Sequence, residues 1–191
     1  MKQWLFEQNL TGVSKAFALA LLSGFIATVT VSCSNDKDVL VTEIGVSPVA
    51  SPAANPSTAK EYYAQGQYKH IQGDTQGAIA AYTKAIGIDD KYVQAYNGRG
   101  LVQFDTGDRQ GAIADYNQAI RISPDNAQAY NNRGNARAAQ GDINGAISDY
   151  DQAIQLNPNY AEAYNNRGNA RASEGERNAA IADYTEACRL K

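Results

Sequence analysis

The chain has 191 residues and a mass of 20.5 kDa, which is enough for one or two domains. Its 17 basic and 20 acidic residues give a formal net charge of −3, which argues against a nucleic-acid protein held by phosphate contacts. Two cysteines and one histidine leave little material for a metal centre or a thiol–imidazole pair. We therefore expect no cofactor, no metal and no nucleic-acid partner.

Residues 1–33 have the pattern of an export signal or a membrane anchor, because a polar, basic beginning precedes the uncharged run 16–32. Ser32 before Cys33 resembles the cleavage box of bacterial lipoproteins, and this resemblance implies a lipid on Cys33. An uncleaved anchor formed by residues 16–32 and ordinary signal cleavage are the alternatives. All three predict the bacterial cell envelope, with a membrane tether in the first two cases and a soluble periplasmic or secreted protein in the third.

Residues 34–58 are rich in Pro, Ser and Ala and show no helical period. Prolines at positions 48, 52 and 56 disfavour a helix and favour an extended chain. We interpret this segment as a disordered linker that holds the following residues away from a membrane.

From residue 59 onward the sequence repeats every 34 residues without an insertion. The four units are 59–92, 93–126, 127–160 and 161–191, and we number the places within each unit from its first residue. Tyr recurs at places 4 and 24, Gly at places 8 and 15, and Ala at places 20 and 27. Such a period indicates one structural unit copied four times.

Each unit is predicted to be a pair of helices. Places 4, 8 and 11 share one helical face, and places 20, 24, 27 and 28 share another. Glycine at place 15 suits the left-handed conformation that ends a helix, and Asp74, Asp108 and Asp142 follow it as helix N-caps. Pro124 and Pro158 are expected to stop the second helix. One pair cannot bury its apolar face alone, so four pairs should stack into eight helices with a continuous core.

This pattern resembles the tetratricopeptide repeat (TPR) family over residues 59–191, although Tyr replaces the family's usual Trp at place 4 and Arg replaces the commoner Leu at place 7. The resemblance implies an all-α, right-handed α-solenoid. It also implies a non-enzymatic scaffold for protein–protein interaction, whose first helices line a concave groove through places 2, 5, 6, 9, 12 and 13. The expected partner is a peptide or a helix of another protein.

The groove places of this chain are rich in amides. Asparagine is a poor helix former, so its repetition along helices is not required for folding. An amide both donates and accepts hydrogen bonds, which suits an extended peptide backbone. A copied solvated face is the alternative interpretation. The predicted partner-binding residues are Asn97, Asn131, Asn132, Asn135, Asn165, Asn166, Asn169, Gln94, Gln128, Tyr63, Gln67 and Phe104.

Charged groups at the groove places are few. The branch of the family that binds chaperones grips a C-terminal carboxylate with Lys and Arg, whereas Lys60 is the only Lys or Arg at these places here. We therefore do not expect a carboxylate clamp. His70 is expected to be a groove or surface residue rather than a metal ligand.

Arginine recurs at place 7 in the last three units, and Asp recurs at place 23 in the same three. The first unit has Gln65 and Ala81 at these places, so both charges are absent together. This coincidence favours an ion pair within each hairpin over an anion-binding stripe. The residues concerned are Arg99, Arg133 and Arg167 with Asp115, Asp149 and Asp183, and the stripe would add Arg137 and Arg171.

The last unit is more polar than the others, which favours a self-capped end. Its Cys188 stands where the other units have Ile, so we expect a buried thiol and no catalytic set. The alternative function is a structural subunit of an envelope assembly complex that docks or self-associates through its open C-terminal helix.

Overall fold

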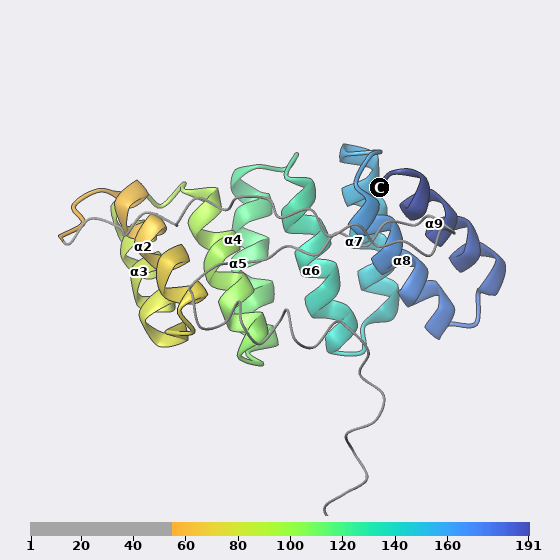
Figure 1. Cartoon of the computed structure of the whole chain (residues 1–191), viewed down its shortest axis with the longest axis horizontal. Helices are drawn as coiled ribbons and strands as arrows, with labels where there is room; N and C mark the ends of the chain where they lie inside the picture. Colours follow the sequence, from red (N-terminus) through yellow and green to blue (C-terminus); the bar gives the residue numbers. More distant parts are fainter. Residues whose placement is uncertain (1–54) are drawn as a thin grey trace, which may run out of the picture. The chain divides into compact units, whose positions relative to one another are not determined.

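The computed structural model of the protein describes residues 55–191, which form eight helices and no strand (Figure 1). The predicted all-α fold is therefore confirmed for the repeats. The predictions for the signal or anchor segment 1–33 and for most of the linker 34–58 lie outside the described residues. Among residues 55–191, no helix combines the length and the apolar character needed to cross a bilayer.

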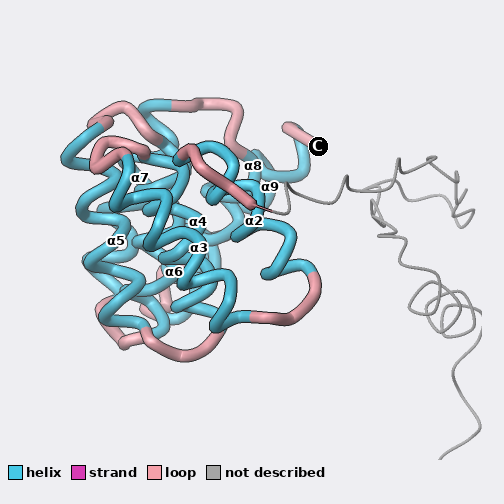
Figure 2. The backbone as a smooth tube through the Cα atoms, turned by 90° about the vertical axis from the view of Figure 1, so that its left-hand side faces the viewer, coloured by secondary structure: helices cyan, strands magenta, loops and turns pink. Residues whose placement is uncertain are grey.

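Each unit forms two helices that are joined by a three-residue turn. The first helices are α2 (Ala59–Ile71), α4 (Val93–Asp105), α6 (Ala127–Ala139) and α8 (Ala161–Ser173). The second helices are α3 (Thr75–Ile88), α5 (Arg109–Ile122), α7 (Ile143–Leu156) and α9 (Arg177–Arg189). Each of α3, α5 and α7 packs against its own first helix and against the first helix of the next unit, so the hairpins follow one another in a row. Figure 2 looks along this row.

The turn inside each hairpin has the predicted chemistry. The four glycines at place 15 have φ between 78° and 89°, a region that a side chain disfavours. Asp74, Asp108 and Asp142 then accept a hydrogen bond from the backbone N–H three residues later. In the fourth unit Glu176 stands at this place and makes no such bond. The capping prediction is confirmed for the three units that carry Asp.

The turn between hairpins does not need its proline. Helices α5 and α7 end two residues before Pro124 and Pro158, as predicted. However, α3 ends at the same place, although Asp90 stands where the other units have proline. Asp89 takes an extended conformation there, with φ −134° and ψ 100°. An extended residue after the last turn is therefore common to the ends of α3, α5 and α7, with or without the proline.

The core is built around the tyrosine at place 24. The Tyr150 ring covers Gly134 of its own hairpin so closely that a Cβ on Gly134 would lie 2.6 Å from Tyr150 Cε1. The same ring packs against Ala146 and against Ala170 of the next hairpin. Tyr116 and Tyr82 repeat this arrangement in the preceding units. Small residues at places 8 and 20, with Ala or Val at place 10 of the next hairpin, thus let one aromatic ring join two hairpins.

The predicted ion pairs between place 7 and place 23 are confirmed. In the third unit Arg133 Nε and Nη2 donate to the two carboxylate oxygens of Asp149, at 3.0 and 2.6 Å. Arg99 with Asp115 and Arg167 with Asp183 form the same two-pronged contact. The side chain of Asp149 is 3% exposed, so the pair lies largely out of water.

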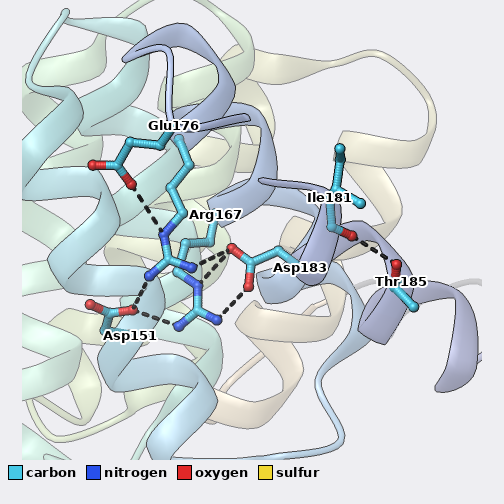
Figure 3. Close-up of polar contacts among 7 residues, drawn as sticks. Asp151, Arg167, Glu176, Ile181, Asp183 and Thr185 are labelled. Atoms are coloured by element: carbon cyan, nitrogen blue, oxygen red, sulfur yellow. Dashed lines mark hydrogen bonds and ion pairs between the residues drawn. The ribbon is translucent and has the colours of Figure 1, made fainter. Parts of the chain in front are cut away.

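Each of these arginines also reaches the preceding hairpin. Arg133 Nη1 donates to Asn117 Oδ1 at 2.7 Å. Arg167 Nη1 donates to Asp151 Oδ1 at 2.6 Å, and Figure 3 shows Arg167 between Asp151 and Asp183. One guanidinium therefore fixes two helices of its own hairpin and the second helix of the hairpin before it.

The outer face of α9 corrects one prediction. Cys188 is exposed rather than buried, because among the described residues no helix packs on this side of α9. Ile181 is 61% exposed for the same reason, whereas Ile79, Ile113 and Ile147 at the same place are partly buried against the core. The last hairpin therefore leaves its apolar face open within residues 55–191.

Replacing Asp149 by Ala is expected to lower the free energy of unfolding by about 3 kcal/mol, because Arg133 and Arg137 lose a buried carboxylate. Asp151→Ala is the matched control on the same helix. Its side chain is 46% exposed, so the expected cost stays below about 1 kcal/mol. Urea unfolding followed by circular dichroism measures both costs. In a double-mutant cycle, Asp149→Ala and Arg133→Ala together should cost less than their sum, and additive costs would refute the pair.

Candidate functional site

A pocket of about 400 Å³ lies between the first helices α4, α6 and α8, with α7 contributing from the second row. We call this space the groove pocket. It collects four of the residues that the sequence predicted to bind a partner, namely Phe104, Asn135, Asn166 and Asn169. The other lining residues are Ala138, Ile143, Tyr150, Ala170 and Ser173.

Two of the pocket's amides are oriented by tyrosine hydroxyls from the second helices. Tyr150 Oη donates to Asn135 Oδ1 at 2.8 Å, and Tyr184 Oη donates to Asn169 Oδ1 at 2.8 Å. Burial raises the pKa of the Tyr150 hydroxyl, because the phenolate would lose its hydration, so this hydroxyl stays a donor. Within residues 55–191 the Nδ2 groups of Asn135 and Asn169 make no hydrogen bond, which leaves these two groups as donors for a bound molecule.

A second pair of amides connects the third and fourth units. Asn166 Nδ2 donates to Asn131 Oδ1 at 3.0 Å, and Asn131 Nδ2 donates to Glu162 Oε1 at 3.2 Å. Asn166 thereby keeps its Oδ1 as an acceptor at the pocket. The role of Asn131 is to hold adjacent first helices together.

The burial of Asn131 corrects its predicted role as a partner contact, whereas for Asn97, which is largely buried, that role stays a prediction. Asn131 is 0% exposed and Asn97 is 9% exposed. A side chain without accessible surface cannot touch a partner while the domain keeps this conformation. Place 5 faces the next hairpin, and residues at the groove places of that hairpin cover it, as Glu162 and Asn166 cover Asn131. The Oδ1 of Asn97 is buried without a hydrogen-bond partner among the described residues.

The remaining predicted residues lie on the first helices outside the groove pocket. Tyr63 packs against the rings of Tyr82 and Tyr92, with centroids 5.7 and 5.4 Å apart, so it belongs partly to the core. Asn132 is half-buried. The exposed members are Gln67, Gln94, Gln128 and Asn165. Whether these side chains contact a partner stays a prediction.

Several lining residues were not predicted. Ala138 and Ser173 stand at places 12 and 13, which belong to the family's groove pattern, so the pattern could have identified them. Tyr150 could not be identified from the groove pattern, because place 24 belongs to the pattern of core residues. Only the hydroxyl of Tyr150 reaches the groove.

The arginines do not form a free cationic stripe. Besides the three at place 7, Arg137 donates to Asp149 at 2.9 Å and Arg171 donates to Asp183 at 2.8 Å. The hydrogen bonds with Asp115 raise the pKa of Arg99, which keeps its guanidinium charged and paired. His70 Nε2 lies 3.1 Å from Asp105 Oδ2, so the histidine faces a carboxylate of the next first helix.

Family models match the repeats of this chain, and solved structures resemble it. The family model described as "TPR repeat" matches residues 69–107, 104–141 and 134–175, and the model "Tetratricopeptide repeat" matches residues 161–191. No curated protein matches the sequence.

The crystal structure of MamA is similar at 26% identity and a TM-score of 0.66, covering 72% of this chain and 80% of that one. The first TPR of Spaghetti (RPAP3), bound to the HSP90 peptide SRMEEVD, is 27% identical with a TM-score of 0.60, and the match covers 62% of this chain and 94% of that one. A double mutant described as MamA RS-1 ArsTM is 19% identical with a TM-score of 0.63, covering 69% and 74%, and shares the fold. The hairpin geometry and the family matches together show that the chain belongs to the tetratricopeptide repeat family.

Proposed function

We propose that this protein is a non-enzymatic scaffold that binds a segment of a partner protein along the groove of its first helices. The observation that carries the proposal is the groove pocket, in which amides from two repeats surround an apolar space of about 400 Å³. Stacked repeats present such a surface over several units at once, which suits an extended segment or a helix. The similar Spaghetti (RPAP3) domain, which was solved with a bound peptide, supports this mode of binding.

The lining of the pocket also supports a binding role over a catalytic one. Its side chains are amides, a serine, a tyrosine and apolar groups, and none of them is a carboxylate, histidine, lysine or cysteine. General acid–base and nucleophilic catalysis at neutral pH depend chiefly on such groups. We therefore assign no reaction to this pocket.

The proposed location is the bacterial cell envelope, with a tether through a lipid on Cys33 or through residues 16–32. The uncharged run and the Ser32–Cys33 step of the sequence support this proposal. The mass of the mature N-terminal peptide tests it. A lipid-modified Cys33 or an intact residue 1 supports a tether, whereas a free N-terminus after Ser32 or Ser34 contradicts it.

Self-association by end-to-end stacking of copies is not favoured by the described residues. In the second, third and fourth units the alanine at place 3 is fully buried, as Ala129 is. Glu61 stands at this place in the first unit, and Tyr68 stands where Ala136 and Ala170 pack. A second copy could not repeat the internal contact on α9 without burying Glu61. Self-association in another arrangement stays a prediction.

The groove proposal predicts that a triple variant, Gln128→Ala, Asn132→Ala and Asn165→Ala, binds its partner at least about tenfold more weakly. Each lost hydrogen bond contributes about 0.5–1.5 kcal/mol, and none of these side chains bonds within the described part of the chain. Alanine is the better helix former, so the melting temperature should not fall. Quantitative affinity capture from envelope extract, followed by titration of the captured partner, measures the effect.

The matched control removes the same side-chain types from the second helices, as Asn144→Ala, Asn178→Ala and Gln152→Ala. All three residues are exposed. A partner that is retained by this control and lost by the groove variant supports the proposal. Equal retention by both variants contradicts groove binding.

A further inference from the structure

We propose that the groove pocket selects one large apolar side chain of an extended segment, reads the backbone beside it through amides, and disfavours acidic segments. The inference rests on the proposed function and names the chemistry of its partner. Three independent observations carry it: the apolar floor, the fixed amides of the rim, and the absence of lysine or arginine at the groove places of the last three units.

The floor of the pocket is apolar. Phe104 contributes from α4, Ala138 from α6, Ile143 from α7 and Ala170 from α8, whereas Tyr150 reaches the pocket through its hydroxyl. A space of about 400 Å³ lies within the range of about 300–1,000 Å³ that ligand pockets span. Because apolar surface gains free energy on leaving water, a leucine or phenylalanine side chain fits this floor better than a polar one.

The rim offers both kinds of hydrogen-bonding group that a peptide backbone requires. The Nδ2 groups of Asn135 and Asn169 are donors for carbonyl oxygens, because the tyrosine hydroxyls already occupy their oxygens. Asn166 presents the opposite group, since its Nδ2 is bonded to Asn131 and its Oδ1 is left as an acceptor. Two donors and one acceptor around an apolar floor match an extended segment whose side chain points into the pocket.

The charges at the groove disfavour an acidic peptide such as the one that is bound to a similar protein. The peptide SRMEEVD bound to Spaghetti (RPAP3) carries three carboxylate side chains. Here the arginines at place 7 of the last three units are paired with Asp115, Asp149 and Asp183, and no groove place of these units carries a lysine or an arginine. Glu162 adds a negative charge at the groove, where it accepts from Asn131. An acidic segment would therefore lose hydration at the groove without gaining a cation.

Peptides of known sequence test this inference on the full chain. The probes are fluorescent octapeptides of Gly and Ser with blocked ends, carrying Leu, Ala or Asp at the centre, together with SRMEEVD. Fluorescence anisotropy should give the Leu peptide a dissociation constant at least about tenfold below that of the Ala peptide. The Asp peptide and SRMEEVD should bind more weakly than the Leu peptide. N-methylation of the backbone next to Leu should weaken binding severalfold, because it removes the N–H group that donates a hydrogen bond to Asn166 Oδ1.

A matched pair of variants locates the binding. Ser173→Phe places a ring at the pocket and should abolish binding of the Leu peptide. Ser148→Phe makes the same change on an exposed part of α7 that does not line the pocket, and binding should be unchanged. Circular dichroism confirms that both variants remain folded.

Four results would overturn the inference: no binding of any peptide, equal binding of the Leu and Ala peptides, tighter binding of SRMEEVD than of the Leu peptide, or full binding by Ser173→Phe. If one of these results is found while the triple variant of Gln128, Asn132 and Asn165 still loses the natural partner, the scaffold function stands and only the proposed chemistry of the partner is wrong.

Discussion

The structure depends on one close contact, in which the tyrosine at place 24 lies over a glycine of its own hairpin. A Cβ on Gly134 would meet the Tyr150 ring at 2.6 Å, so the two helices can approach this closely only because glycine stands there. The same ring continues to Ala170 of the next hairpin. The contact therefore closes a hairpin and attaches its neighbour, and the buried core consists of one such cluster at each of the three junctions between hairpins.

The same tyrosine connects the core to the groove. Its ring is buried, while its hydroxyl reaches across the hairpin to Asn135 at place 9. The core thereby fixes the orientation of the Asn135 amide, whose Oδ1 accepts from the tyrosine and whose Nδ2 is left for a partner. On the other side of the first helix, Arg133 stacks near Tyr130 at 5.4 Å and pairs with Asp149. The guanidinium groups at place 7 are thus held between helices by carboxylates, and the polarity of the groove in the last two units comes mainly from amides.

The sequence allowed the hairpins, their turns and the ion pairs to be predicted, because each depends on residues at fixed places of one repeat. The pair of Arg133 and Asp149 could be inferred since the first unit lacks both charges. The burial of individual side chains could not be inferred in the same way. Asn131 and Asn165 have the same place, but Asn131 is buried by the next hairpin, and Asn165 is exposed because no described helix follows it. The exposure of Cys188 has the same cause.

The link between core and groove is tested most directly by removing one hydroxyl. Tyr150→Phe keeps the ring over Gly134 and frees Asn135 to rotate, whereas Tyr116→Phe is the same change in a unit where Leu101 replaces the asparagine. The measurement is the dissociation constant of the blocked Leu octapeptide for both variants. We expect Tyr150→Phe to weaken binding severalfold and Tyr116→Phe to leave it unchanged. Equal affinities for the two variants would contradict the link.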